Sequence, residues 1–502
     1  MTQSNLEARS NPRPNILLIM TDQQRGDCLG CDGHPVLETP YLDELASKGT
    51  RFAKAYTASP SCLPARATLL TGMSQWRTGI LGMGRGQGQI PNTFKHTMPG
   101  ELAKAGYHTQ AIGKNHFDPY RALNGYHNCI IDESSRVPDS DYFSWFAENK
   151  TGPYGYRDHS VGWNSWMARP THLPEHMHPT HWTAQQAIDW LPRRDPSAPF
   201  FLKVSFARPH SPFDPPQVYY DMYKDRRMPD PVIGDWCDDP TGSPQSNDTD
   251  AWQSKRTDAE IQRARACYYG NITFIDHQIG RLLYHMQKDH AQALANTMII
   301  FVSDHGDMMG DHHLWRKTYG FEGSARVPMI VVPPANASNV LRNQVRQEIV
   351  ELRDIMPTVL AAAGVPIPET CVGMDMLPLT QDGPVDWRND LHGEHCQCYA
   401  AEQANHYLTD GQYKYLWMPY TGKQLLFDLD TDPGECHDLS EQSQHTETLQ
   451  RMRQRLAEIL KERGSTDLLD EAGDLRILTP EEFWTSPNYR KFNMQASSAV
   501  TD

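Results

Sequence analysis

The chain has 502 residues, of which 38% are hydrophobic and 22% charged; this is the composition of a globular protein and excludes wholesale disorder. Its net charge of −15 argues against nucleic acid or an anionic membrane as the main partner, because both need basic surfaces. An anionic substrate is not excluded, since salt screens exposed charges beyond about 8 Å and a locally positive pocket can work inside an acidic shell.

The cellular compartment is predicted from apolar runs and cysteines. No segment approaches the roughly 20 apolar residues of a membrane span. The apolar run at 16–20 is too brief for the core of a signal peptide. The ten cysteines are scattered, and the close pairs Cys28/Cys31 and Cys396/Cys398 do not match a four-cysteine zinc site. Free thiols without a leader predict a cytoplasmic protein.

The first predicted elements are a strand and a helix. Residues 15–20 form a continuous apolar run, as expected of a strand buried in a parallel sheet, and the run leads to Asp22. Thr39 followed by Pro40 is typical of a helix start, with Gly49 just beyond the end.

Three further apolar runs, at 109–112, 200–204 and 298–302, predict strands of the same kind. A charged or metal-binding residue follows each of them closely. In open α/β sheets, ligands bind beyond the carboxyl ends of the strands. The pattern therefore predicts an α/β protein whose polar site lies at one edge of a large, mostly parallel sheet.

The clearest predicted helix spans 257–285, where Thr257 and Glu260 form a capping box ahead of apolar residues at three- and four-residue spacing. A shorter helix is expected at 183–190. The stretch 238–255 has the composition of a surface insertion. Later, 412–417 and 424–429 predict paired strands, and 446–463 predicts an amphipathic helix.

We divide the chain into four parts on this basis. Residues 1–13 are expected to be a flexible N-terminus, 14–385 a catalytic domain, 386–480 a C-terminal subdomain and 481–502 a tail. The boundary is placed near the stretch 384–388. Part of the tail, residues 484–492, could dock on a neighbouring copy, and the oligomeric state is left open.

The strongest motif is Cys-Leu-Pro-Ala-Arg, from Cys62 to Arg66, followed by a short helix-forming run. Four other motifs accompany it in order: Thr-Asp-Gln-Gln at 21–24, Gly-Lys-Asn-His at 113–116, Arg-Pro-His at 208–210 and Ser-Asp-His-Gly at 303–306, with Lys317 behind them. Together they resemble the formylglycine-dependent sulfatases of the alkaline-phosphatase superfamily, nearest to the branch with choline sulfatases and phosphonate monoester hydrolases.

This resemblance implies an alkaline-phosphatase-like three-layer sandwich, with a smaller C-terminal subdomain of antiparallel sheet and helix. It also implies that a formylglycine-generating enzyme converts Cys62 to an aldehyde, whose hydrate attacks sulfur. An ordinary thiolate is the competing nucleophile, but a thiolate–sulfate adduct has no easy way to release sulfate. We therefore favour modification of Cys62, placed just before a helix that starts near Pro64, where the helix dipole favours negative charge.

The resemblance assigns the remaining catalytic roles by motif position. Arg66, Lys114 and Lys317 would form a cationic clamp on the nucleophile and the sulfate oxygens. His116 would deprotonate the second hydroxyl of the hydrate during sulfate release. His210, with Lys317, would protonate the leaving group.

The metal ligands are predicted to be Asp22, Gln23, Asp304 and His305, together with residue 62. Oxygen donors from two strand ends suit Ca²⁺, the ion that the resemblance implies. Gln23 and His305 depart from the aspartate and asparagine of the family pattern, and imidazole admits Mn²⁺, with Mg²⁺ as a further alternative.

Two other groups are given structural interpretations. His172, His176, His178 and His181 are close in sequence, but a polar loop lining the substrate pocket is favoured over a second metal site. Glu322 and Arg326 resemble a stretch that supports the site rather than acting in it.

The sequence thus predicts a sulfuric ester hydrolase, with a weak preference for a sulfated sugar or glycan fragment. That preference comes from the long insertions at 76–95, 117–182 and 211–256 and their Trp, His and Arg content. The alternative enzyme is a phosphonate monoester or phosphodiester hydrolase with the same nucleophile. A non-catalytic binding protein is disfavoured, because decay of the activity would have erased some of the catalytic set.

Overall fold

The structure, a computed structural model, describes residues 13–83, 90–133 and 140–488. The N-terminus predicted to be flexible at 1–13 lies outside these ranges except for Arg13, which donates a hydrogen bond to the Ala105 carbonyl.

An eight-stranded sheet forms the centre of the molecule, in the order β11-β2-β10-β9-β1-β8-β5-β7. Its five inner and edge strands from β9 to β7 are parallel: β9 (Thr297–Ser303), β1 (Asn15–Asp22), β8 (Phe200–Pro209), β5 (His108–Gly113) and β7 (Asn128–Ile131). Four of them are the strands predicted from the apolar runs. The other three are β10 (Met329–Val332), antiparallel to β9, then β2 (Thr50–Phe52) and β11 (Gln344–Arg346).

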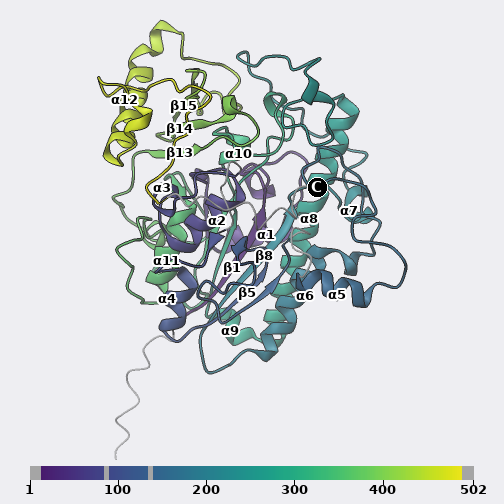
Figure 1. Cartoon of the computed structure of the whole chain (residues 1–502). Coiled ribbons are helices and arrows are strands. Elements are labelled where there is room, and N and C mark those ends of the chain that lie inside the picture. Colours follow the sequence, from purple (N-terminus) through teal and green to yellow (C-terminus); the bar gives the residue numbers. More distant parts are fainter. Residues whose placement is uncertain (1–12, 84–89, 134–139, 489–502) are drawn as a thin grey trace, which may run out of the picture.

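Helices cover both faces of this sheet, so that the architecture is the expected three-layer sandwich (Figure 1). One face packs on α2 (Cys62–Thr71), α4 (Met98–Lys104) and α11 (Ile355–Ala362), and the other on α1 (Pro40–Lys48), α6 (Pro179–Trp190) and α8 (Asp258–Asp289). Strand β1 is buried over its whole length, with Leu18 in one core and Leu17 in the other. Its continuous apolar run follows from this double burial.

The helix starts differ from expectation in two places. Helix α2 begins at Cys62 rather than near Pro64, because the first turn of a helix leaves its backbone N–H groups unpaired and so accommodates proline. Helix α6 begins at Pro179, four residues early, where the His178 Nδ1 accepts from the Thr180 N–H. The capping box of Thr257 and Glu260 at the start of α8 is confirmed.

The C-terminal subdomain is a four-stranded antiparallel sheet with one helix against it, at the top of Figure 1. Its elements are β13 (Leu391–His395), β14 (Asn405–Thr409), β15 (Tyr413–Trp417), β16 (Gln424–Asp428) and α12 (Thr446–Glu462). The two predicted strands and the predicted helix are confirmed, whereas β13 and β14 were not foreseen. The predicted domain boundaries stay a prediction.

The tail differs from expectation. Trp484 is 1% exposed in the core of its own C-terminal subdomain, where its Nε1 donates to Glu394 Oε2 at 3.3 Å. The start of the tail therefore packs on its own chain rather than on a neighbour. Residues 489–492 of the predicted docking segment lie outside the described residues.

The remaining elements are short. They are the helices α3 (Gln75–Thr78), α5 (Asp141–Asn149), α7 (Gln217–Asp221), α9 (Ala291–Ala295) and α10 (Glu322–Ala325), and the strands β3 (Ala55–Tyr56), β4 (Ile90–Pro91), β6 (Phe117–Asp118) and β12 (Val350–Glu351).

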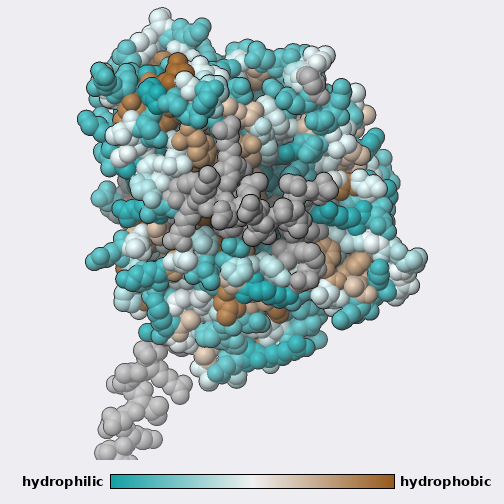
Figure 2. Space-filling view, viewed as in Figure 1, coloured by the Kyte–Doolittle hydropathy of each residue, from teal (hydrophilic) through white to brown (hydrophobic). Residues whose placement is uncertain are grey.

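The surface and the cysteines complete the picture. The face shown in Figure 2 is mainly hydrophilic. Among the described helices, none is both long and apolar enough to cross a bilayer. All ten cysteines are free thiols. The cytoplasmic location stays a prediction.

Candidate active site

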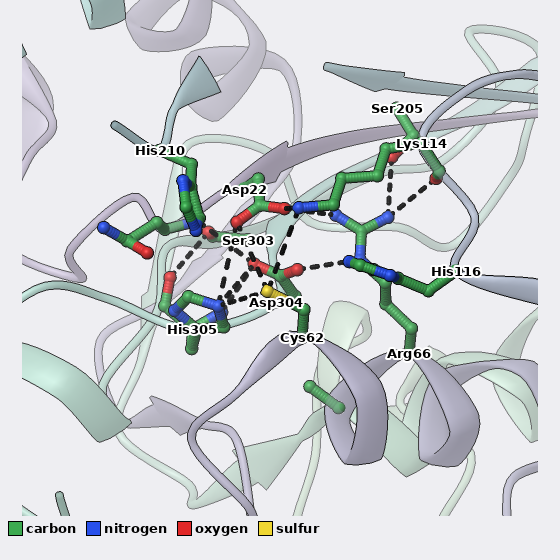
Figure 3. A network of polar contacts seen from close by, with 12 residues as sticks. Asp22, Cys62, Arg66, Lys114, His116, Ser205, His210, Ser303, Asp304 and His305 are labelled. Carbon is green, nitrogen blue, oxygen red and sulfur yellow. Dashed lines mark hydrogen bonds and ion pairs between the residues drawn. The ribbon is translucent and has the colours of Figure 1, made fainter. Parts of the chain in front are cut away.

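The site lies at the carboxyl ends of the central strands, as the strand pattern predicted. Asp22 ends β1, Lys114 follows β5, His210 follows β8 and Asp304 follows β9. Because β1 pairs with both β8 and β9, Asp22 lies in the middle of this row. Helix α2 adds Cys62 as its first residue (Figure 3).

Four side chains present donor atoms to one point. The donors of Asp22, Cys62, Asp304 and His305 all lie within 4.8 Å of one another, and all four residues are buried. His305 Nε2 is 3.7 Å from an oxygen of each aspartate and 3.1 Å from the Cys62 Sγ. His305 Nδ1 is 2.8 Å from the Gly306 carbonyl, to which it donates, so Nε2 keeps its lone pair for the cluster.

Arg66 joins the two carboxylates. Its Nε donates to Asp304 Oδ2 at 2.8 Å and its Nη2 to Asp22 Oδ2 at 3.1 Å. Its Nη1 donates to the Lys114 carbonyl at 2.7 Å and to Ser205 Oγ at 2.9 Å. Arg66 thus holds the carboxylates of Asp22 and Asp304 and the backbone of Lys114 in place. Among the described residues, no hydrogen bond joins Arg66 to Cys62.

Lys114 lies between Asp22 and Cys62. Its fully buried ammonium forms an ion pair with Asp22 Oδ2 and lies 3.9 Å from the Cys62 Sγ. Burial and the Asp22 carboxylate both oppose ionisation of the thiol, but Lys114, Lys317 and His305 outweigh them and lower the pKa of Cys62 to about 7. The position is therefore built to hold a nucleophile carrying negative charge.

Lys317 and His210 form a second group on the other side of Asp22. The Lys317 ammonium donates to His210 Nε2 at 2.6 Å and to Gln23 Oε1 at 2.7 Å. His210 Nδ1 donates to the Ser211 carbonyl at 2.8 Å, and the backbone N–H of His210 donates to the Asp22 carbonyl at 2.9 Å. The Lys317 ammonium and the His210 imidazole are therefore in direct contact.

Gln23, predicted as a metal ligand, has both amide atoms in hydrogen bonds with side chains. Its Oε1 accepts from Lys317, and its Nε2 donates to Asp307 Oδ2. Both ends of the amide therefore have protein partners, and Gln23 connects Asp307 to Lys317.

His116 is held by Glu133. It is 1% exposed, and its backbone N–H donates to Glu133 Oε1 at 2.9 Å. Its Nδ1 lies 3.9 Å from Glu133 Oε2. Glu133 therefore fixes the turn that follows Lys114.

Sequence reasoning missed several residues of the site. Asp307 lies three residues after Asp304 in the sequence, but no motif marked it as a site residue. Trp163 gave no signal, although its ring stacks on His210 at 4.7 Å and lies 5.5 Å from the Lys114 ammonium. His395 of β13 also gave none, yet its Nε2 lies 2.8 Å from the Oγ of Ser61, the residue before Cys62.

The residues given structural interpretations have structural contacts. His178 caps α6 and lies 3.5 Å from Asp214, and His172 Nε2 is 2.9 Å from the Gly155 carbonyl. Glu322 forms ion pairs with Arg326 and with Lys414 of β15, and so connects the catalytic sheet region to the C-terminal subdomain.

A comparison with known families decides the class of the protein. The family model described as sulfatase matches residues 14–365, which contain every predicted catalytic residue. The chain belongs to the sulfatase family. A second model, described as the C-terminal part of N-sulphoglucosamine sulphohydrolase, matches residues 310–462.

Curated relatives agree. This sulfatase is 42% identical to an arylsulfatase of Clostridium perfringens over 91% of this chain and 96% of that one, and 30% identical to a choline-sulfatase of Rhizobium meliloti over 86% and 83%. The chain is therefore a sulfuric ester hydrolase.

Solved structures agree on the fold. A phosphonate monoester hydrolase of Agrobacterium radiobacter superimposes with a TM-score of 0.76 at 24% identity, covering 90% of this sulfatase and 96% of that chain. A structure in complex with D-glucosamine-2-N,6-O-disulfate gives a TM-score of 0.72 at 21% identity, covering 91% and 99%. The alkaline-phosphatase-like sandwich is confirmed.

Proposed function

We propose that this sulfatase hydrolyses its ester through a formylglycine at position 62, assisted by one divalent cation. The observation that carries the proposal is the position of Cys62: first residue of a buried helix, in contact with His305 and Lys114, and at the point where Asp22 and Asp304 converge. The Cys62 Sγ stands in here for the oxygens of the aldehyde hydrate.

The donor set fits a divalent cation. Asp22 and Asp304 supply carboxylate oxygens and His305 an imidazole nitrogen, with residue 62 beside them. Ligands that share one Ca²⁺ at about 2.3–2.6 Å lie within about 5 Å of one another, which matches the 4.8 Å limit of this cluster. When bound, the ion would offset the charge of the sulfate oxygens. We propose Ca²⁺, with Mn²⁺ and Mg²⁺ as alternatives.

The residues around position 62 have separate roles in the reaction. One hydroxyl of the hydrate attacks sulfur as the ester S–O bond breaks, and the second hydroxyl then loses its proton so that the aldehyde reforms and sulfate departs. The Lys114 ammonium stabilises the negative charge of the nucleophile, and Arg66 keeps the carboxylates of Asp22 and Asp304 in position. We assign the proton removal to His116, on the resemblance of its motif position.

Protonation of the leaving group is assigned to His210 and Lys317. Their 2.6 Å contact allows a proton of Lys317 to reach the ester oxygen directly or through His210. Trp163, stacked on His210, limits the orientation of that ring.

For the substrate we propose a sulfated sugar or glycan fragment, with aryl sulfates as surrogates. The support is indirect: relatives include an arylsulfatase and an N-acetylglucosamine-6-O-sulfatase of Bacteroides thetaiotaomicron, and the latter is 24% identical. A phosphonate monoester hydrolase is the second candidate, since one such enzyme shares the fold at a TM-score of 0.76.

The deciding experiment joins mass spectrometry to kinetics. In protein from the native host we expect the peptide containing residue 62 to carry an aldehyde in place of the thiol. The same protein should hydrolyse 4-nitrophenyl sulfate faster than a phenyl phosphonate monoester. Faster phosphonate turnover would favour the second candidate.

The matched variant is Cys62→Ala. It should abolish turnover and leave the melting temperature nearly unchanged, because the substitution removes a single sulfur atom that lies among polar groups. Full activity of native protein whose residue 62 is still cysteine would overturn the proposal.

A further inference from the structure

A segment of the C-terminal subdomain lies along the catalytic centre. It starts at His395, next to Ser61 as described above. It ends at Asn405, whose Nδ2 donates to the carbonyl of Thr318, the residue after Lys317, at 2.8 Å. Residues 395–405 therefore run from the start of α2 to the Lys317 loop.

Buried polar atoms of this segment and of the Lys317 loop have no hydrogen-bond partner among the described residues. They include Nε of Arg316 and both amide atoms of Gln397. Arg316 is 7% exposed and Gln397 1%. Buried polar groups normally have hydrogen-bond partners, so several unsatisfied ones together mark a place that a polar molecule fills.

The position of Arg316 separates it from the catalytic cations. Its guanidinium lies 4.9 Å from the centre of the Tyr399 ring. Its charge is met by Asp250, whose oxygen is 3.5 Å from Nη2 and whose side chain is 64% exposed. The next residue, Lys317, instead points its ammonium to His210 and Gln23. Arg316 and Lys317 are adjacent in sequence, but their side chains therefore contact different groups of residues.

Arg316, Gln397 and Tyr399 together form a wall, and stacked aromatic rings extend it. Tyr399 lies nearly parallel to Trp252, with an interplanar angle of 18° and ring centres 6.4 Å apart. Gln397 and Tyr399 lie in the chain between His395, which contacts Ser61 beside Cys62, and Asn405, which contacts Thr318 beside Lys317, so this wall adjoins the catalytic residues.

We propose that Arg316, Gln397 and Tyr399 form a subsite for a second anionic group on the alcohol part of the substrate, a carboxylate or a further sulfate. The Nε–H of Arg316 offers a charge-assisted donor to an oxygen of such a group. The Gln397 amide and the Tyr399 hydroxyl add donors beside it. This inference rests on the proposed function and narrows its substrate to acidic or multiply sulfated esters.

The test compares aryl sulfates that differ in one substituent. The probes are 3- and 4-carboxyphenyl sulfate, 1,4-phenylene disulfate and the neutral 4-carbamoylphenyl sulfate. We expect the native enzyme to favour at least one dianionic probe by about 10- to 100-fold in kcat/KM, the range of a charge-assisted hydrogen bond in a buried site. The probe type with the larger gain in kcat/KM, carboxylate or disulfate, identifies the anion that the subsite binds.

The variant Arg316→Gln should remove this preference and change kcat/KM for the neutral probe by less than about threefold. Tyr399→Phe and Gln397→Leu should each reduce the preference in part, and they serve if Arg316→Gln does not fold. The matched control is Arg256→Gln, which removes another guanidinium stacked on an aromatic ring, that of Trp166 at 4.0 Å. It should leave the preference intact.

Two results would overturn the inference: no preference for any dianionic probe in the native enzyme, or an equal loss on neutral and dianionic probes in Arg316→Gln. Failure of the proposed function is distinguishable, because then 4-nitrophenyl sulfate itself would not be hydrolysed by the native enzyme.

Discussion

At the scale of single residues, Gln23 shows how one side chain can change role with its neighbours. Its amide can satisfy both partners in one orientation only, with the oxygen toward the Lys317 ammonium and the nitrogen toward the Asp307 carboxylate. Asp307 is itself held, since its Oδ1 accepts from the backbone N–H groups of Met309 and Arg316. Gln23 is therefore placed to position Lys317.

We expect Gln23→Leu to slow the hydrolysis of phenyl sulfate, a poor leaving group, about 10- to 100-fold. The loss on 4-nitrophenyl sulfate should be smaller, because a good leaving group needs less protonation. Rates for a series of aryl sulfates and the metal content of the variant are the measurements.

The control is Gln24→Leu, which removes an amide that donates to the Cys28 carbonyl away from Lys317. If Gln23→Leu instead lost its metal and slowed all esters equally, Gln23 would be a ligand after all, as the sequence predicted.

At the scale of elements, β13 joins the C-terminal sheet both to the catalytic helix and to its own outer helix. Its His395 contacts Ser61 at the start of α2. Its Glu394, 0% exposed, accepts two hydrogen bonds from Arg463 just after α12, at 2.5 and 2.8 Å. One strand thus positions the start of α2 and fixes α12.

Glu394 gives this connection a pH dependence. Burial favours the neutral carboxyl, but Arg463 and its hydrogen bonds outweigh burial and hold the pKa of Glu394 well below its usual range. A lowered folded-state pKa contributes stability that is present above the unfolded value, about 4.3, and is lost as the pH falls toward the folded value.

We expect Glu394→Gln to lower the free energy of unfolding by roughly 3 kcal/mol at pH 7, because it leaves Arg463 without its partner charge. The difference from the native protein should shrink as the pH falls from 5 to 3. Denaturant unfolding at several pH values measures it.

Asp390→Asn is the control, because it breaks a partly exposed pair with Arg455 that should be worth at most about 1 kcal/mol. A constant difference between Glu394→Gln and the native protein across this pH range would show that the ion pair is not the cause.

At the scale of the whole molecule, the site depends on parts of the chain far apart in sequence. Asp22 ends β1, residue 62 begins α2 and Asp304 follows β9, and a bound cation would join all three. Without it, two buried carboxylates rely on Arg66 and Lys114 for compensation. Metal binding should therefore stabilise the fold as well as support turnover.

We expect removal of the metal by a chelator to abolish hydrolysis and to lower the melting temperature. A ligand present at 100 times its Kd stabilises a protein by about 2.7 kcal/mol. Calorimetry and turnover before and after chelation measure both effects, and added Ca²⁺ should restore them; recovery with Mn²⁺ only would change the proposed ion.

Asp304→Asn should bind less metal and show a smaller thermal shift on chelation. An unchanged melting temperature after verified loss of the metal would contradict this proposal.

Local sequence patterns were enough to predict the sheet and the row of polar residues at its edge. Buried parallel strands must be continuously apolar, and ligands bind where such strands end, so the runs at 15–20, 109–112, 200–204 and 298–302 predicted both. The capping box at Thr257 is equally local, because its two partners are three residues apart.

The contacts of Gln23, the place of Trp484 and the wall formed by Arg316, Gln397 and Tyr399 became visible in three dimensions only. These depend on contacts between residues up to several hundred positions apart, such as Gln23 with Lys317 and Glu394 with Trp484. No periodicity or local motif records such contacts, because hydrogen bonds and packing act between neighbours in space rather than along the chain.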